Sequence, residues 1–99
     1  MVQEIDLSHI GGYFDRQCHV DEQARAIVLT TDAIDHARRV AAKLRMERID
    51  CSMRVDPSGS RIKLRISGKE DLQRWESLIG FKTDEKRTRL RRILESYEE

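Results

Sequence analysis

The sequence predicts an α+β domain in which helices cover one face of a four-stranded antiparallel sheet, with the element order αββαββαα. Residues 61–67 alternate between charged and apolar side chains, as a half-buried strand does. Residues 32–46 carry apolar side chains in a stripe at helical spacing. The 99-residue chain contains one proline and five glycines and shows no linker, so we expect a single domain over residues 1–99.

The first half of the chain predicts a helix, a hairpin and a second helix. Apolar residues recur at helical spacing over 6–16, and Asp6 or Ser8 is placed to cap that helix. Gly11 and Gly12 fall inside it, where each costs about 1 kcal/mol relative to alanine, so a packing reason is expected. The remaining elements are strands over 18–20 and 25–31, a turn at 21–23, and a helix over 32–46 capped by Thr31 or Asp32.

The second half predicts a hairpin followed by two helices. Pro57-Ser58-Gly59-Ser60 has the composition of a turn, and it separates two segments with strand character. Gly80 is placed to end the first of the two helices, and Thr83 to cap the second. The predicted ranges are 51–56 and 61–67 for the strands, and 69–79 and 84–97 for the helices.

The distribution of charge is more informative than its total, because the formal net charge is only +1. If the helices cover the face that bears Ile62, Leu64 and Ile66, the other face is basic. Such a face can neutralise phosphates and place guanidinium groups in a groove, which favours nucleic acid as the partner. The alternative is an ordinary solvated sheet face. The predicted DNA-binding residues are Arg54, Arg61, Lys63 and Arg65, with Asp56 as the one acid of that alternating set.

The cysteines and histidines show no recognisable metal-ligand spacing. Cys18 and Cys51 form no CxxC pair, and a zinc site would have to draw on scattered residues. We therefore expect two reduced, partly buried thiols and no bound metal. No apolar run approaches membrane-spanning length and no signal pattern opens the chain, so a cytoplasmic protein without a membrane partner is expected.

Two segments resemble the LAGLIDADG homing endonuclease family, as a degenerate member with one copy of the motif. The first is residues 10–20, IGGYFDRQCHV, which resembles the signature helix and the start of the first strand. The second, more specific one is residues 66–90, ISGKEDLQRWESLIGFKTDEKRTRL, and together the segments extend over most of the chain. The resemblance implies the αββαββαα fold and a sheet that forms a saddle over DNA.

One copy of the motif implies a homodimer, because the family packs two signature helices against each other along a central axis. Small residues permit that close approach, which would explain the glycine pair. Close packing within one monomer is the alternative. The interface residues implied by the resemblance are Ile10, Gly11, Gly12 and Phe14.

The catalytic position of the family is altered in this chain. The essential acid falls at residue 17, where the residue is Gln17, a poor ligand for Mg²⁺. Asp15 occupies the earlier acidic position, which acts in the family more as a helix-end residue than as a metal ligand. Lys86 falls where family members carry a lysine.

The leading hypothesis is therefore a homodimeric protein that binds double-stranded DNA without cutting it and without a cofactor. One alternative is a compact homodimeric endonuclease that uses Mg²⁺ in an atypical active site. Another is a protein-interaction module that reuses the fold, with the basic sheet facing an acidic partner.

Overall fold

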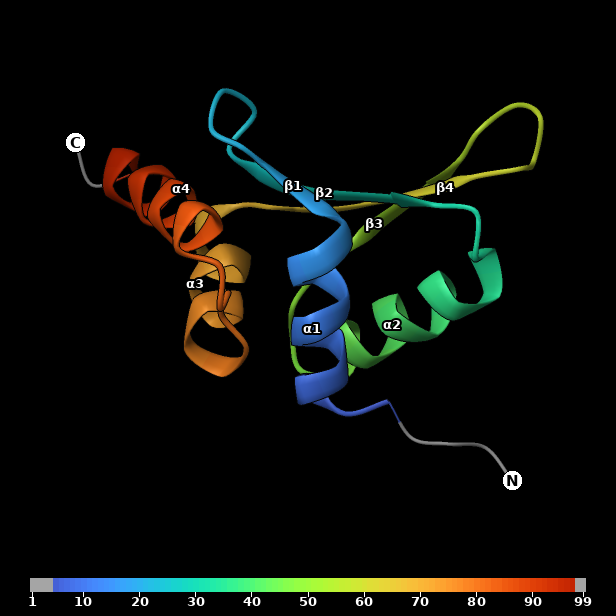
Figure 1. The fold of residues 1–99 in the computed structure, drawn as a ribbon, viewed down its shortest axis with the longest axis horizontal. Helices are drawn as coiled ribbons and strands as arrows, with labels where there is room; N and C mark the ends of the chain where they lie inside the picture. Colours follow the sequence, from blue (N-terminus) through green and yellow to red (C-terminus); the bar gives the residue numbers. More distant parts are fainter. Residues whose placement is uncertain (1–4, 98–99) are drawn as a thin grey trace.

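The structure, a computed structural model, describes residues 5–97 and has the predicted αββαββαα order (Figure 1). Each element lies within two residues of its expected bounds. The elements are α1 (Leu7–Gln17), β1 (Cys18–Asp21), β2 (Ala26–Thr31), α2 (Ile34–Met46), β3 (Ser52–Val55), β4 (Ile62–Ser67), α3 (Lys69–Leu78) and α4 (Asp84–Ser96).

The four strands form one antiparallel sheet in the order β1-β2-β4-β3. The two hairpins therefore meet along β2 and β4, where Leu29 lies opposite Leu64. Helices α1, α2 and α3 lie on one side of the sheet, and α4 flanks its β1 end (Figure 1). The other side of the sheet has no helix on it in Figure 1, and we call it the open face.

The core lies between the sheet and the helices. Trp75 of α3 packs against Phe14 of α1 and Phe81 of the α3–α4 loop, with ring centres 4.7 and 5.4 Å apart. From the sheet, β4 contributes three fully buried side chains, which are Ile62, Leu64 and Ile66. The strict alternation predicted for this strand is confirmed: its apolar residues are buried and Lys63, Arg65 and Ser67 are exposed.

The predicted helix caps are confirmed in part. Asp6 caps α1 by accepting a hydrogen bond of 2.7 Å from the His9 amide. For α2 the prediction was wrong: neither Thr31 nor Asp32 caps the helix, which begins two residues later at Ile34. The Thr31 hydroxyl instead accepts a hydrogen bond from the Ala33 amide, and so stabilises a turn before the helix. Gly80 ends α3 as expected, with a positive φ of 71° and its amide bonded to the Trp75 carbonyl.

Strand β3 is less buried than its apolar residues suggest. Met53 and Val55 are 44% and 40% exposed, because β3 is an edge strand. Within residues 5–97, no helix has the length and apolar character needed to cross a membrane.

Candidate nucleic-acid interface

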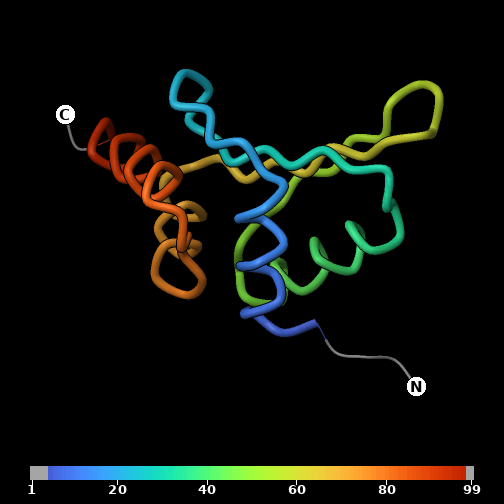
Figure 2. Tube along the Cα trace, viewed as in Figure 1, coloured from blue at the N-terminus to red at the C-terminus, as the bar shows by residue number. Residues whose placement is uncertain are grey.

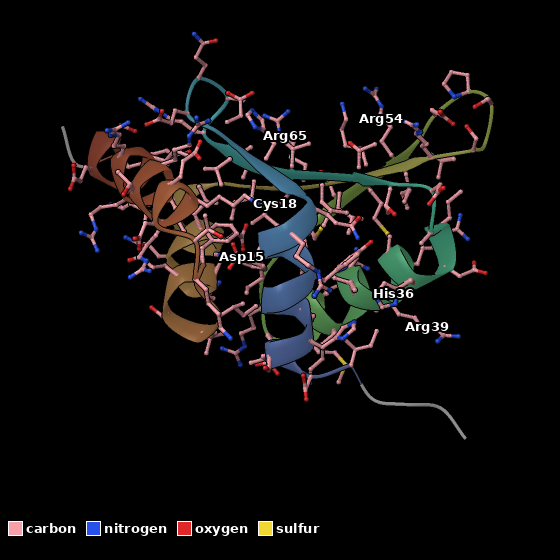
Figure 3. The ribbon with its side chains drawn as sticks, in the orientation of Figure 1. Asp15, Cys18, His36, Arg39, Arg54 and Arg65 are labelled. Atoms are coloured by element: carbon pink, nitrogen blue, oxygen red, sulfur yellow. The ribbon has the colours of Figure 1, made fainter. Side chains whose placement is uncertain are left out.

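The open face carries the four cations that the sequence predicted. Arg54 of β3 lies directly opposite Lys63 of β4, and Arg65 lies two residues further along the same strand. Arg61 immediately precedes β4, and all four side chains are exposed. Arg54 and Arg65 extend from the side of the sheet opposite the helices (Figure 3). Like charges placed directly opposite each other are unfavourable for a sheet, so this arrangement does not serve folding.

The open face is concave in one direction. The β1–β2 turn and the β3–β4 turn both rise above the sheet on the side away from the helices, as the ribbon and the tube show (Figures 1 and 2). Near the second turn lies a hollow of about 440 Å³, whose lining includes Arg54, Arg61, Lys63 and Thr30. We did not predict from the sequence that Thr30 belongs to this face, because the pairing of β2 with β4 cannot be inferred from local sequence pattern.

The acid expected on this face, Asp56, is engaged elsewhere. Its carboxylate accepts hydrogen bonds from the Ser58 hydroxyl and from the Ser60 and Arg61 amides of the turn. Desolvation alone would raise the pKa of Asp56, but these hydrogen bonds outweigh it and lower that pKa. Within residues 5–97, none of the four cations of the open face takes part in a salt bridge.

The acidic turn of the first hairpin is also engaged within the chain. The Asp21 carboxylate accepts hydrogen bonds from the Gln23 and Ala24 amides, which closes the turn. Glu22 forms a salt bridge of 3.6 Å with Arg92 of α4. Only Glu22 is paired with a cation, and it therefore opposes a nearby phosphate less than an unpaired carboxylate would.

Asp15, the acid of the motif, connects the end of α1 to the α3–α4 loop. Its carboxylate accepts hydrogen bonds from the Lys82 amide at 2.7 Å, the Thr83 amide at 3.3 Å, and the Thr83 hydroxyl. Thr83 is the N-cap residue of α4, as expected, but its hydroxyl bonds to Asp15 and not to an amide of the helix. Desolvation would raise the pKa of Asp15, but the bonds from Thr83 and Lys82 and the charge of Lys86 outweigh it and lower that pKa.

The end of α1 does not fit a magnesium ion. Both oxygens of Asp15 already accept hydrogen bonds from the loop, and Gln17 offers a neutral amide where Mg²⁺ prefers carboxylate oxygen. Lys86 donates to the Asp15 carbonyl, so its ammonium group lies at the negative end of the α1 helix dipole. Burial raises the pKa of the neighbouring Cys18 thiol to about 12, which leaves it protonated at neutral pH.

The four residues predicted at a dimer interface divide into two kinds. Ile10 and Phe14 are fully buried in the core of the monomer, so their side chains are not available to a second copy. A Cβ atom on Gly11 would lie 3.1 Å from Ile79 Cγ2, so this glycine does have a packing reason within the monomer. A Cβ atom on Gly12 would meet nothing within 4 Å.

Gly12 belongs to a surface hollow of about 280 Å³ between α1 and the end of α3. Leu78, which is 46% exposed, also lines it. Small and apolar residues dominate this hollow, and they are Leu7, Ser8, Gly11, Gly12, Leu78, Ile79 and Gly80. We call this surface the α1–α3 groove.

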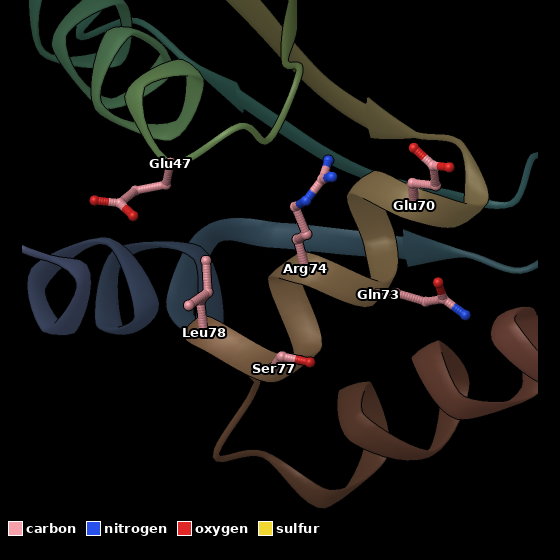
Figure 4. Close-up of a pocket in the computed structure, with 6 residues that line it drawn as sticks. All are labelled: Glu47, Glu70, Gln73, Arg74, Ser77 and Leu78. Carbon is pink, nitrogen blue, oxygen red and sulfur yellow. The ribbon is translucent and has the colours of Figure 1, made fainter.

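A larger hollow, of about 530 Å³, lies away from the open face, between the end of α2 and α3 (Figure 4). Its charged residues have both signs, with Glu47 and Glu70 beside Arg74. Arg74 donates a hydrogen bond to the Arg48 carbonyl at 3.0 Å, which joins α3 to the end of α2. The arrangement joins two helices, and its charged lining consists of two acids and one base.

Comparison with known proteins adds no relative: no family model, curated protein or solved structure matches this chain.

Proposed function

We propose that this chain binds double-stranded DNA as a homodimer through the open face of its sheet and does not cut it. The observation that carries the proposal is the set of four exposed cations on that face, none of which pairs with an acid within residues 5–97. This arrangement accords with the resemblance to the LAGLIDADG family, in which the sheet forms a saddle over DNA. A cytoplasmic location is part of the same proposal.

The geometry of the open face suits a duplex. Its two turns rise above the sheet (Figure 1), Arg54 and Arg65 extend between them (Figure 3), and a cylindrical partner would lie there. Phosphates would contact lysine and arginine, and the guanidinium groups of Arg54 and Arg65 could form paired hydrogen bonds with guanine in the major groove. Asp56 is the one acid of the alternating set, its hydrogen bonds hold it to its own turn, and the four cations outnumber it.

The α1–α3 groove supports the homodimer. Gly12 leaves open space above the α1 backbone, and a second copy of α1 could approach closely there. The half-exposed Leu78 offers apolar surface beside it. The proposed contact therefore uses Gly12, Ser8 and Leu78, and the buried Ile10 and Phe14 support it from beneath.

The absence of cutting rests on the end of α1. Asp15 stabilises the α3–α4 loop and Gln17 is neutral, so neither residue supplies a free carboxylate for a metal. In a homodimer the same residues would occupy both halves, and no partner domain could compensate.

The test is selection from a randomised duplex pool by the purified protein at moderate salt, without divalent metal. We expect the retained duplexes to share a palindromic or pseudo-palindromic consensus, as two-fold protein symmetry requires. Retention at background level would contradict DNA binding, and would favour a protein-interaction module. Nicking of the selected duplex by the wild-type protein in Mg²⁺ would contradict the non-cutting part of the proposal.

The dimer is tested by sedimentation of the wild type and of Gly12→Trp. Because a Cβ atom at residue 12 meets nothing within 4 Å and opens into a surface hollow, this substitution should leave the monomer folded and block association. The control is Arg38→Trp, at an exposed position on α2 away from the groove. A wild type that sediments as a monomer, also with its selected duplex, would contradict the homodimer.

A further inference from the structure

Two histidines from different helices meet on the helix side of the molecule. His9 lies in the first turn of α1 and His36 in the first turn of α2. Their Nε2 atoms are 3.3 Å apart, their ring centres are 5.2 Å apart, and the ring planes are nearly perpendicular, at 87°. We propose that His9 and His36 form a binding site for a divalent transition-metal ion such as Zn²⁺ or Ni²⁺. This inference does not depend on the proposed DNA binding.

The two distances fit nitrogens that converge on one ion. Two imidazole nitrogens bound to a tetrahedral zinc ion at about 2.0–2.1 Å lie about 3.3 Å apart, and their ring centres then lie about 5.2 Å apart. A straight N–H···N hydrogen bond between the same atoms would place the ring centres about 5.6 Å apart, since both rings would lie on the line of the bond. The observed distances match those of two ligands on one ion, and they exclude only a straight hydrogen bond between the rings.

The surrounding structure orders the His36 ring more than the His9 ring. The His9 amide is bonded to the Asp6 cap, which fixes the backbone of the first turn of α1, while the His9 side chain is exposed. The buried ring of Tyr13 lies beside both histidines, with centres 6.4 Å from His9 and 4.9 Å from His36. Ordering of the ligands before binding favours affinity.

Each histidine would bind the ion through its Nε2 atom. A metal ion binds neutral imidazole, with the ring proton on Nδ1. Within residues 5–97 no three or more His, Cys, Asp or Glu side chains converge on one point, so the chain supplies two ligands and water completes the coordination.

The sequence alone did not predict this site, because His9 and His36 are 27 residues apart and match no ligand motif. The fold brings the two rings together across the space between α1 and α2. His36 and Arg39 of α2 lie on the side of the sheet opposite Arg54 and Arg65 (Figure 3). The proposed metal site is therefore separate from the open face.

The experiment is a titration of the full chain with NiCl₂ and with ZnCl₂. Binding is measured by calorimetry and by the change in melting temperature. The variants are His9→Ala and His36→Ala, and the control is His19→Ala, the third histidine, which is exposed on β1. We expect one ion to bind per chain and to raise the melting temperature. Either variant should weaken binding by at least about tenfold, and the control should bind as the wild type does.

A second readout is the broadening of histidine ring signals by Ni²⁺ in the NMR spectrum of the wild type. The site requires the His9 and His36 signals to broaden together, before that of His19. Broadening of all three alike, equal binding by the wild type and His9→Ala, or no binding at millimolar metal would each overturn the proposal.

Discussion

The two sides of β4 differ sharply although they share one backbone. Ile62, Leu64 and Ile66 are at most 1% exposed and pack in the core. Arg61, Lys63 and Arg65 alternate with them and project into solvent. Burial of the first set stabilises the fold, whereas the second set contributes little to it and is free to bind. Stability and binding are thus assigned to alternate residues of one strand, and substitutions on each side should have separable effects.

The largest effect on stability is expected from the buried side. Leu64→Ala leaves a cavity at the centre of the sheet and should lower the free energy of unfolding by about 2–5 kcal/mol. Urea denaturation measures this. A loss well under 1 kcal/mol would mean that the core tolerates the cavity and that the comparison between the two sides is wrong.

A smaller loss is expected from the link between α1 and the α3–α4 loop. Asp15→Ala removes a carboxylate that accepts three hydrogen bonds, and should cost about 1–3 kcal/mol near neutral pH. Because the folded pKa of Asp15 lies below its unfolded value of about 3.9, this stabilisation is complete above that value. It is lost as the pH falls through the folded pKa. The stability difference between the two proteins should therefore begin to shrink as the pH falls below about 4, and a difference that stays constant as the pH is lowered further would contradict the role of the charge.

Within α1, Gly11 and Gly12 also differ in their surroundings: a Cβ atom on Gly11 would contact Ile79, and one on Gly12 would contact nothing. Gly12→Ala should raise the stability of the monomer by about 0.5–1 kcal/mol, because it gains helix propensity and meets no neighbour. Gly11→Ala should gain less, or lose stability, because its Cβ atom approaches Ile79 Cγ2 to 3.1 Å. Thermal unfolding at low protein concentration compares the two. Equal gains would show that Gly11 has no packing role.

The smallest effect on stability is expected from the open face. The double variant Lys63→Ala, Arg65→Ala should unfold within about 0.5 kcal/mol of the wild type, since surface substitutions rarely do more. The matched control is Arg38→Ala, Arg91→Ala, which removes two exposed arginines from α2 and α4. A large destabilisation by the first pair would mean that these cations have a structural role that their exposure does not reveal.

The elements of the fold could be predicted because local pattern determines them. Alternation defined β4, apolar spacing defined the helices, and Gly80 marked the end of α3. The capping bonds were harder to predict, since the hydroxyls of Thr31 and Thr83 bond elsewhere once the chain is folded. Asp15 could be placed at the end of α1, but its partners Lys82 and Thr83 lie 67 and 68 residues away. The meeting of His9 with His36 depends in the same way on how two helices pack.

The cations of the candidate interface could be predicted from the sequence, but the shape of the interface could not. Arg54, Arg61, Lys63 and Arg65 follow from alternation within one hairpin. The rise of both turns above the open face depends on the twist of the sheet and on the strand order β1-β2-β4-β3, which no local pattern states.

The most direct test of DNA binding by the open face is the salt dependence of duplex affinity. Fluorescence anisotropy with a labelled selected duplex would be recorded over a range of KCl concentrations for the wild type, for Lys63→Ala, Arg65→Ala, and for Arg38→Ala, Arg91→Ala. Affinity of the wild type should fall linearly on logarithmic axes, with a slope of about −0.9 for each phosphate contacted. The first variant should bind more weakly and with a shallower slope, while the control pair matches the wild type. Equal slopes and affinities for all three proteins would contradict the assignment of DNA binding to the open face.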